Sequence, residues 1–433
     1  MKQDLAGKRL LILGGRPAAS LDIVRIAKRL GIYTVVTDNL SVEKSPAKAI
    51  ADEVWNISTS NVDVLEQMVT EHRIDGIITG AHEFNLQRAK ELCDRLGFPF
   101  YATDLQLRLN FDKVFFKQKC QEYSIPVPQS YELSYPPQEE DMKKIAYPVI
   151  VKPLDGSGGQ GISICQDAQE LCIASKLAHD NSPSGQIIVE EYVTGREITA
   201  VYTLKSGQIS LSTFRDRYPT EEHDRTTAQY DLSLMPSRHT RRFYDTEHPK
   251  FVNMLQSVDA RDGCIFFQGI VTVDRIVFFE CGYRINALCD YHNICQLNQI
   301  NYLEMMINHS LTGKMEPYEL EQDNVFPSTV SAIFNMTAHG GVIGRQVGAE
   351  AVRQMKNVIA ADYLHTEGDT IVENGSLGQS VFRAHVFGDN LQELADVIRQ
   401  IQQQVIIEDT NGANMLYHPF DTDRLFCKGD NVL

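Results

Sequence analysis

VIVKPLDGSGGQG, residues 149 to 161, is the stretch on which the interpretation of this chain depends. Its β-branched start predicts a buried strand that carries Lys152, and a loop with four glycines follows. Glycine allows positive φ and lets backbone N–H groups approach a ligand closely, and converging N–H groups form a concave anion site. The stretch therefore predicts a phosphate-binding loop beside a lysine.

The order of residues in this stretch excludes two common phosphate motifs. The lysine precedes the glycines and a strand is predicted to follow, whereas a P-loop and a dinucleotide-binding turn both lead into a helix. Taken alone, the stretch is explained equally well as a glycine-rich hairpin turn. The rest of the chain has to decide between these interpretations.

Residues 9 to 103 alternate between predicted strands and predicted helices, which is typical of an open parallel sheet with ligands at the carboxyl ends of its strands. Gly14-Gly15 and Asp38 imitate part of a dinucleotide-binding fold, but the full fingerprint is missing. The segment from Gly80 to Asn85 follows a strand, where it either faces a ligand or forms a helix-capping turn.

Charged residues at the ends of elements supply further candidates. Lys113 lies in the first turn of a helix predicted within residues 110 to 128, where the helix dipole disfavours a cation, so it requires an anion or is simply solvated. Glu280 ends an apolar strand, which is costly unless the carboxylate is paired or metal-bound. Arg383 lies on an apolar strand and either reaches the active site or bridges structural acids.

Residues 207 to 240 are polar, and we expect either an exposed hairpin with a mobile loop or a substrate lid. Within them, the sequence from Arg215 to Tyr218 (RDRY) either contacts substrate or forms a solvated charged loop, and the loop is the favoured interpretation.

Composition excludes several classes of partner. The 433 residues include 41 basic and 57 acidic residues and carry a net charge of −16, and no long basic run is present, which argues against nucleic acid and anionic membranes. Nine cysteines without C-x-x-C pairs indicate reduced thiols of a cytoplasmic protein. No apolar run reaches the ~18 residues of a membrane span, so we expect neither export nor membrane insertion.

The order of these features resembles the ATP-grasp superfamily of ATP-dependent carboxylate ligases, in the branch related to the carbamoyl-phosphate-synthase large chain and biotin carboxylase. The resemblance implies a mixed α/β and α+β chain in three parts. A Rossmann-like open parallel sheet (residues 1–110) would precede a two-lobed ATP-grasp domain (residues 111–315) with its hinge near residues 190–193. An α+β lobe (residues 316–433) would follow.

The resemblance also implies roles for single residues. The residues implied to bind phosphate are Lys113, Lys152, Gly156, Ser157, Gly158, Gly159 and Gly161. The linker of Glu190, Glu191, Tyr192 and Val193 would bind adenine, partly through the Glu190 carboxylate, and Glu197 would bind ribose. Glu280 would be the principal metal ligand, and Arg284 would act with Lys152 in catalysis, beside the reacting carboxylate or phosphate.

The metal site departs from the family pattern. Twelve residues before Glu280, where a second acid is usual, this chain has Gln268, and two residues after Glu280, where asparagine is common, it has Gly282. Asn286 is a candidate substitute. Fewer anionic ligands predict weaker Mg²⁺ binding, or binding only together with ATP.

The function implied by the resemblance is ATP-dependent ligation of a small-molecule carboxylate to an amine. An acyl phosphate would be the intermediate, with ADP and phosphate as products and ATP and Mg²⁺ required. The alternative is a non-catalytic nucleotide-binding sensor or scaffold of the same fold, and a biotin-dependent carboxylase or carbamoyl-phosphate former is a third option. A homodimer is the default oligomer.

Overall fold

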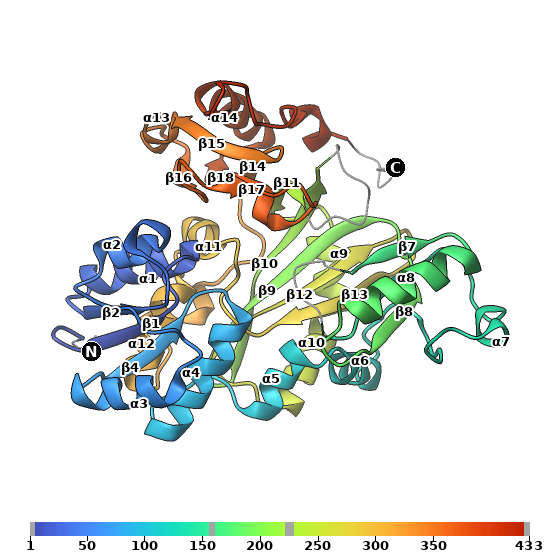
Figure 1. Ribbon diagram of the computed structural model, residues 1–433, viewed down its shortest axis with the longest axis horizontal. Coiled ribbons are helices and arrows are strands. Elements are labelled where there is room, and N and C mark those ends of the chain that lie inside the picture. The colour runs from blue at the N-terminus through green and yellow to red at the C-terminus, as the bar shows by residue number, and fades with distance from the viewer. Residues whose placement is uncertain (1–4, 156–160, 221–228, 428–433) are drawn as a thin grey trace.

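The computed structural model describes residues 5–155, 161–220 and 229–427, and its strands form four sheets (Figure 1). An N-terminal parallel sheet lies on one side of the molecule. A small four-stranded lobe lies on the other side, and an eight-stranded antiparallel sheet runs between them. A C-terminal lobe covers one end of that large sheet.

The N-terminal sheet is parallel and open, as predicted from the alternating pattern. Its strand order is β3-β2-β1-β4, and both faces are covered by apolar cores. The strands are β1 (Arg9–Leu13), β2 (Tyr33–Thr37), β3 (Glu53–Trp55) and β4 (Gly76–Thr79), and the helices are α1 (Ala18–Arg29), α2 (Pro46–Ile50), α3 (Val62–Glu71) and α4 (Glu83–Leu96).

Asp38, at the end of β2, serves the structure of this domain. Its carboxylate accepts hydrogen bonds from the Gly15 amide at 2.8 Å and the Ser45 hydroxyl at 2.7 Å, and it pairs with Lys48 at 2.7 Å. These contacts hold the pKa of Asp38 below its usual value, although burial acts in the opposite direction. The partial likeness to a dinucleotide fold is therefore explained by a buried capping network.

The small lobe contains the glycine-loop stretch. Its strand order is β5-β8-β6-β7, and helix α8 packs on one face. Its elements are β5 (Ser130–Tyr131), α7 (Glu139–Met142), β6 (Val149–Pro153), β7 (Ser163–Cys165), α8 (Ala168–Asp180) and β8 (Ile187–Glu191). Side chains alternate along β6, so Val149 and Val151 enter the core under α8 while Ile150 and Lys152 lie on the opposite face.

The predictions from sequence were least accurate for the large sheet. Its order is β13-β12-β9-β10-β11-β14-β18-β16. The strands are β9 (Arg196–Lys205), β10 (Gln208–Pro219), β11 (Tyr230–Met235), β12 (Gly263–Val271), β13 (Ile276–Gly282), β14 (Val330–Thr337), β16 (Val358–Tyr363) and β18 (Ser380–Gly388). The polar segment after residue 207 is thus largely two sheet strands, and the solvated-loop interpretation was wrong because Arg215 and Asp216 are buried.

Aromatic packing explains how a polar sequence forms central strands. Phe214, on β10, stacks on Phe243 with ring centroids 4.3 Å apart and joins the core formed with α5, α6, α9 and α10. These helices are α5 (Asp104–Phe111), α6 (Lys113–Glu122), α9 (Thr240–Thr246) and α10 (His248–Ser257). Because side chains alternate, the polar residues of β10 fall on the other face.

That other face meets α11 (Tyr291–Asn298) and α12 (Tyr302–Thr312). Helix α12 also packs on β4 so closely that a Cβ at Gly76 would lie 2.1 Å from the Ser310 carbonyl oxygen. The N-terminal sheet and the large sheet are therefore joined through α12.

The C-terminal lobe contains β15 (Gly341–Val347), α13 (Ala349–Arg353), β17 (Thr370–Ile371), α14 (Leu391–Gln404) and β19 (Ile406–Asp409). Short 3-10 helices lie at Val42–Lys44, Leu320–Gln322, Leu377–Gln379 and Thr422–Leu425. Strands β14, β16 and β18 belong to the large sheet, so the sheet crosses the predicted boundary at residue 315. The three-part division of the chain stays a prediction.

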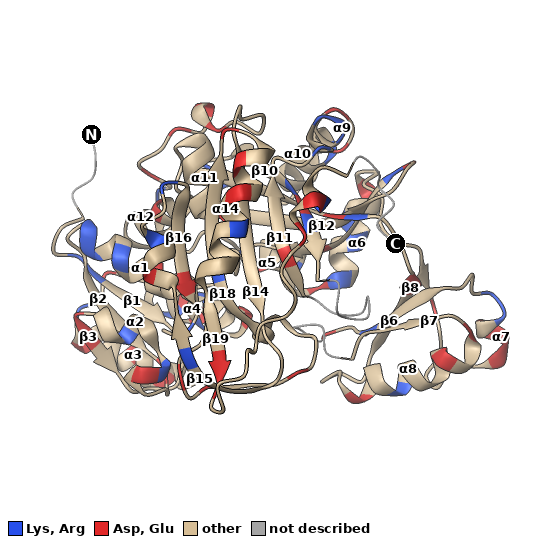
Figure 2. Cartoon of the chain, turned by 90° about the horizontal axis from the view of Figure 1, so that it is seen from above, with Lys and Arg blue, Asp and Glu red and all other residues tan. Residues whose placement is uncertain are grey.

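Basic and acidic residues are interspersed along the chain in all of these parts (Figure 2). Among the described residues, no helix has the length and apolar character needed to cross a membrane.

Candidate nucleotide-binding cleft

The face of the small lobe opposite α8 carries a buried cluster of charges. The Lys152 ammonium lies 2.8 Å from Oε2 of Glu190, whose side chain is only 1% exposed. The other carboxylate oxygen, Oε1, is paired with Lys117 of α6, and Lys117 also donates to the Ser130 hydroxyl at 3.0 Å. One buried carboxylate therefore has two ammonium partners, and the cluster carries one net positive charge when all three groups are ionised.

Burial lowers the pKa of both lysines in this cluster. The pKa of Lys152 falls to about 7, because burial is reinforced by the positive charges of Lys117 and Lys113, while Glu280 acts in the opposite direction. The pKa of Lys117 falls to about 8, mainly through burial. Both groups gain from an anionic ligand, because a nearby negative charge stabilises the ammonium form.

Lys113 is placed as predicted, in the first turn of α6. Asp112 caps this helix by accepting a hydrogen bond from the Phe115 amide at 2.9 Å, and the Lys113 ammonium donates to the Pro153 carbonyl at 3.2 Å. Burial lowers the pKa of Lys113, and the charges of Glu280, Glu83 and Asp155 oppose this shift. Carboxylates from three parts of the chain therefore act on this lysine.

The glycine loop is described only at its ends. Gly156, Ser157, Gly158 and Gly159 lie outside the described residues. Gly161 has φ +73°, and a Cβ there would lie 2.9 Å from Pro153 Cγ and from Asn181 Cβ, so this position requires glycine. The loop begins beside Asp155, whose carboxylate accepts from the Ser182 hydroxyl at 2.5 Å.

Backbone hydrogen bonds and the Glu191 carboxylate hold the linker of residues 190–193 in place. The Glu191 amide donates to Gln129 and the Tyr192 amide to Pro148, at 2.9 and 3.1 Å. The Glu191 carboxylate accepts two bonds from Arg275, at 2.9 and 3.0 Å, which ties the linker to the β12–β13 turn. Adenine binding by Glu190, Tyr192 and Val193 stays a prediction, and the Glu190 carboxylate is directed to the two lysines instead.

Glu280 and Gln268 are brought together by the large sheet. They are directly opposite each other on β13 and β12, and the same row continues through Thr199 of β9 to Arg215 of β10. Directly paired residues of an antiparallel ladder share one face, so these four side chains form a polar row. Glu280 is exposed and Gln268 is partly buried, and both offer oxygen atoms suited to Mg²⁺.

A steric contact explains why position 282 lacks a side chain. A Cβ at Gly282 would lie 2.1 Å from Cζ of Phe266, its direct partner on β12, so any side chain at this position has to displace the Phe266 ring. Asn286 is 4% exposed, and its Oδ1 accepts from the Leu288 amide at 3.0 Å. The Asn286 oxygen thus uses one of its two lone pairs within its own turn, and its role as a metal ligand stays a prediction.

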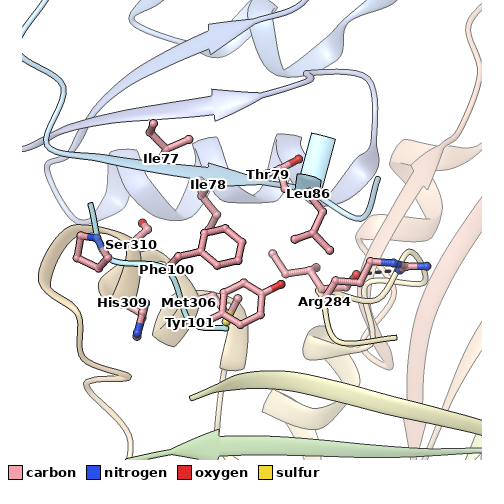
Figure 3. Close-up of a pocket in the computed structure, with 13 residues that line it drawn as sticks. Ile77, Ile78, Thr79, Leu86, Phe100, Tyr101, Arg284, Met306, His309 and Ser310 are labelled. Atoms are coloured by element: carbon pink, nitrogen blue, oxygen red, sulfur yellow. Dashed lines mark hydrogen bonds between the residues drawn. The ribbon is translucent and has the colours of Figure 1, made fainter. Parts of the chain in front are cut away.

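Arg284, which follows β13 in the chain, connects the large sheet to the N-terminal domain. Its guanidinium lies 3.2 Å from Glu83, at the start of α4, and 5.2 Å from the centre of the Phe266 ring. The segment from Gly80 to Asn85 thus both begins a helix and faces the candidate site. Arg284 also lies at the edge of a cavity of about 20 Å³, lined mainly by apolar residues (Figure 3), which has room for about one water molecule. This cavity is too small for a nucleotide.

Glu197, on β9, forms an ion pair with a residue on the same face of the large sheet. Its carboxylate is 40% exposed and lies 3.2 Å from Arg217 of β10. Its implied contact with ribose stays a prediction.

The sequence analysis named Arg215 and Arg383 as candidates but did not identify the partners that the structure gives them. Arg215 and Asp290 form an ion pair of 2.9 Å in which neither side chain is exposed, and Arg383 donates to Asn335 and to the Ala287 carbonyl at 2.8 and 2.7 Å. Lys117 was also missed, although its position one turn after Lys113 was a usable signal.

These contacts define the class of the site. Lys117 of α6 and Lys152 of β6 share the Glu190 carboxylate, and Glu280, paired with Gln268 on the large sheet, acts on the charges of Lys113 and Lys152. Several ammonium groups near a carboxylate–amide pair are the charge pattern that a nucleoside triphosphate with a divalent ion requires. Among the described residues, no group of three His, Cys, Asp or Glu side chains could hold a metal alone. A metal at Glu280 and Gln268 would therefore need oxygens from the nucleotide.

Comparisons with known proteins agree with this class. Residues 112–204 match the family described as carbamoyl-phosphate synthase L chain, ATP binding domain. The formate-dependent phosphoribosylglycinamide formyltransferase of Sulfolobus acidocaldarius is 28% identical over 232 residues, which are 52% of this chain and 56% of that protein. The chain spans about half the length of the curated relatives it matches.

Solved structures confirm the fold over nearly the whole chain. The L-amino acid ligase from Bacillus licheniformis superposes with a TM-score of 0.74 at 16% identity, covering 93% of this chain and 99% of that one. The biotin carboxylase domain of 2-oxoglutarate carboxylase from Hydrogenobacter thermophilus, solved with MgADP, ADP and bicarbonate, gives a TM-score of 0.76 at 18% identity, covering 93% and 90%. The chain has the ATP-grasp fold, and its residues 112–204 match the family model of an ATP-binding domain.

Proposed function

We propose that this protein is an ATP-dependent ligase that joins a small-molecule carboxylate to an amine through an acyl phosphate. The observation that carries the proposal is that α6, which carries Lys113, packs on β13, which carries Glu280, and that the Glu280 charge acts on both Lys113 and Lys152. The names of the ligases and the formyltransferase with which the chain shares its fold or its ATP-binding segment support the same reaction class.

In the first step, a carboxylate oxygen of the substrate attacks the γ-phosphorus of ATP. The bond from that phosphorus to the β,γ-bridging oxygen breaks, and ADP leaves with the electron pair. Lys113 and Lys152 neutralise the phosphate oxygens on which negative charge accumulates, and such positioning and charge stabilisation account for most of the catalysis in phosphoryl transfer.

In the second step, the amine nitrogen attacks the carbonyl carbon of the acyl phosphate. The bond from carbon to the phosphate oxygen breaks, phosphate leaves, and the amine loses a proton to solvent. Arg284 is suited to hold the substrate carboxylate before the first step, because Glu83 orients its guanidinium and its Nε, which is buried, has no hydrogen-bond partner among the described residues.

We propose that Glu280, with Gln268, holds Mg²⁺ when ATP is bound. The ion would supply charge neutralisation for the phosphates, as Mg²⁺ bound by one or two carboxylates commonly does. Asn286, whose oxygen accepts one hydrogen bond within its turn, is the further candidate ligand of this proposal. Binding of adenine at residues 190–193, binding of ribose at Glu197, and assembly as a homodimer are further parts of this proposal.

The direct test measures ATP-dependent phosphate release from the purified protein with a panel of carboxylates and amines. Glu280→Gln should leave binding of adenosine unchanged and lower turnover by at least tenfold, whereas Glu139→Gln, an exposed site on α7, should have no effect. A loss below about threefold, under ~1 kcal/mol of barrier, would show that Glu280 is not the metal ligand.

The alternative of a nucleotide sensor or scaffold is favoured by one observation, the single carboxylate in the Glu280–Gln268 pair. It predicts tight ATP binding that does not respond to Mg²⁺ and no phosphate release with any substrate pair. Calorimetry with ATP in the presence and absence of Mg²⁺ separates the two functions.

A further inference from the structure

Lys117 has contacts that none of the assigned roles explains. Its side chain is buried on α6, and its ammonium is shared between Glu190 and Ser130. Ser130 lies directly opposite Glu190 across the β5–β8 ladder. The hydrogen bond to Ser130 therefore helps to hold the Lys117 ammonium beside the Glu190 carboxylate.

Lys152 is held differently. Among the described residues, its ammonium has Glu190 as its one ion-pair partner, at 2.8 Å, and β6 leads directly into the glycine-rich loop in the sequence. Lys152 can therefore turn towards a phosphate by giving up one contact, whereas Lys117 would give up two.

The charges of the three groups show why a second lysine is needed. A Lys152–Glu190 pair without Lys117 has no net charge and attracts a triphosphate weakly. Moving Lys152 to the phosphates would then leave a carboxylate that is 1% exposed without a cation, and an uncompensated buried charge is strongly destabilising. When Lys117 stays beside Glu190, the cluster keeps a net positive charge that attracts the triphosphate, and the buried carboxylate keeps a cation.

We propose that Lys117 is a positioning residue that remains the counter-ion of Glu190 while Lys152 turns to the ATP phosphates. The inference rests on the proposed binding of ATP at Lys152 and deepens it. It also assigns to Glu190 the function of holding the two lysines in place.

The test is calorimetry of two probes, ATP with Mg²⁺ and adenosine, on the full chain. Lys117→Met should weaken ATP binding by about tenfold, equal to about 1.4 kcal/mol, and leave adenosine binding within twofold. The matched control is Lys119→Met on the same helix, since Lys119 is paired with Glu122 at 2.8 Å on the α6 surface, and it should change neither affinity.

A double variant separates positioning from general structural damage. In Glu190→Gln/Lys117→Met the buried carboxylate is gone and Lys152 alone carries the one net positive charge of the wild-type cluster, so ATP affinity should return to within about threefold of the wild type. Lys117→Arg should also bind ATP nearly normally, because it restores the charge. If Lys117→Met does not fold, an ATP affinity of the double variant about tenfold below that of the wild type overturns the inference.

Two results would overturn the inference. One is an unchanged ATP affinity in Lys117→Met, and the other is a double variant that binds ATP as weakly as Lys117→Met, which would mean that Lys117 acts independently of Glu190. If the wild type does not bind ATP, the proposed function itself fails. If the wild type binds ATP but the variants do not follow this pattern, only the role of Lys117 is wrong.

Discussion

Replacing Gln268 with glutamate places a second carboxylate directly opposite Glu280 on the neighbouring strand. Directly opposed residues have Cβ atoms about 5 Å apart. Two unit charges at about 5 Å repel by about 1 kcal/mol in a water-like environment and by about 3 kcal/mol at an effective dielectric constant of about 20. Because Glu280 is exposed, we expect the Mg²⁺-free Gln268→Glu protein to lose about 1 kcal/mol of unfolding free energy.

Added Mg²⁺ should reverse this loss and increase stability further. A ligand at a hundred times its Kd adds about 2.7 kcal/mol to the unfolding free energy, and the second carboxylate should lower the Mg²⁺ concentration needed for ATP binding by about tenfold, equal to about 1.4 kcal/mol. Thermal unfolding with and without Mg²⁺, and calorimetry of ATP over a Mg²⁺ series, measure the two effects.

Gln268→Ala serves as the matched control for this substitution. It removes the amide without adding charge and should raise the Mg²⁺ requirement slightly. If Gln268→Glu changes neither the Mg²⁺ dependence of ATP binding nor the response of the unfolding temperature to Mg²⁺, the Glu280–Gln268 pair is not the metal site.

Three further predictions follow from buried groups. ATP binding should weaken as the pH rises from 6 to 9, because ATP binds the protonated form of Lys152 and the lowered pKa of about 7 causes this charge to be lost within that range; calorimetry at each pH measures the change. Asp290→Asn should cost about 3–5 kcal/mol in urea unfolding, because it leaves the fully buried charge of Arg215 without its partner. Gly282→Ala should cost about 1–3 kcal/mol in the same assay, because the new Cβ overlaps the Phe266 ring.

Each of these predictions has a control and a contradicting result. Lys152→Met should remove the part of the pH dependence centred near pH 7 and leave the part near pH 8 that belongs to Lys117, and an unchanged profile near pH 7 would assign that titration to another group. The control for Asp290→Asn is Asp245→Asn, which removes the partner of Arg241 in an exposed pair at 3.7 Å. It should lower the unfolding free energy by under about 0.5 kcal/mol. Gly378→Ala meets only the Ser376 hydroxyl, at 3.2 Å, and should be nearly neutral. If a variant at a buried site and its control lose the same unfolding free energy, the prediction for that buried site is wrong.

Local pattern was sufficient for the N-terminal sheet and for the lysine of the glycine-loop strand. Parallel strands buried on both faces appear in sequence as continuous apolar runs separated by amphipathic helices, so the alternation in residues 9–103 identified the sheet directly. Lys113 was placed correctly because its helix start carries a local cap at Asp112. The comparisons with known proteins confirm the fold class that the order of these motifs predicted.

The strand that contains Arg215 shows where local pattern failed. Its charges indicate solvent exposure when only neighbouring residues are considered, yet Arg215 is paired with Asp290, 75 residues away. An ion pair between distant residues leaves no periodic signal, so burial of the charges could not be inferred from the segment itself.

The sequence by itself therefore determined the elements, their order and the types of charge available for a nucleotide. Only the tertiary structure decided which charges meet: Lys117 with Glu190, Arg284 with Glu83, and Glu280 opposite Gln268. The physical reason is that propensity and periodicity act over a few residues, whereas pairing across strands and lobes depends on register and packing between segments far apart in the chain.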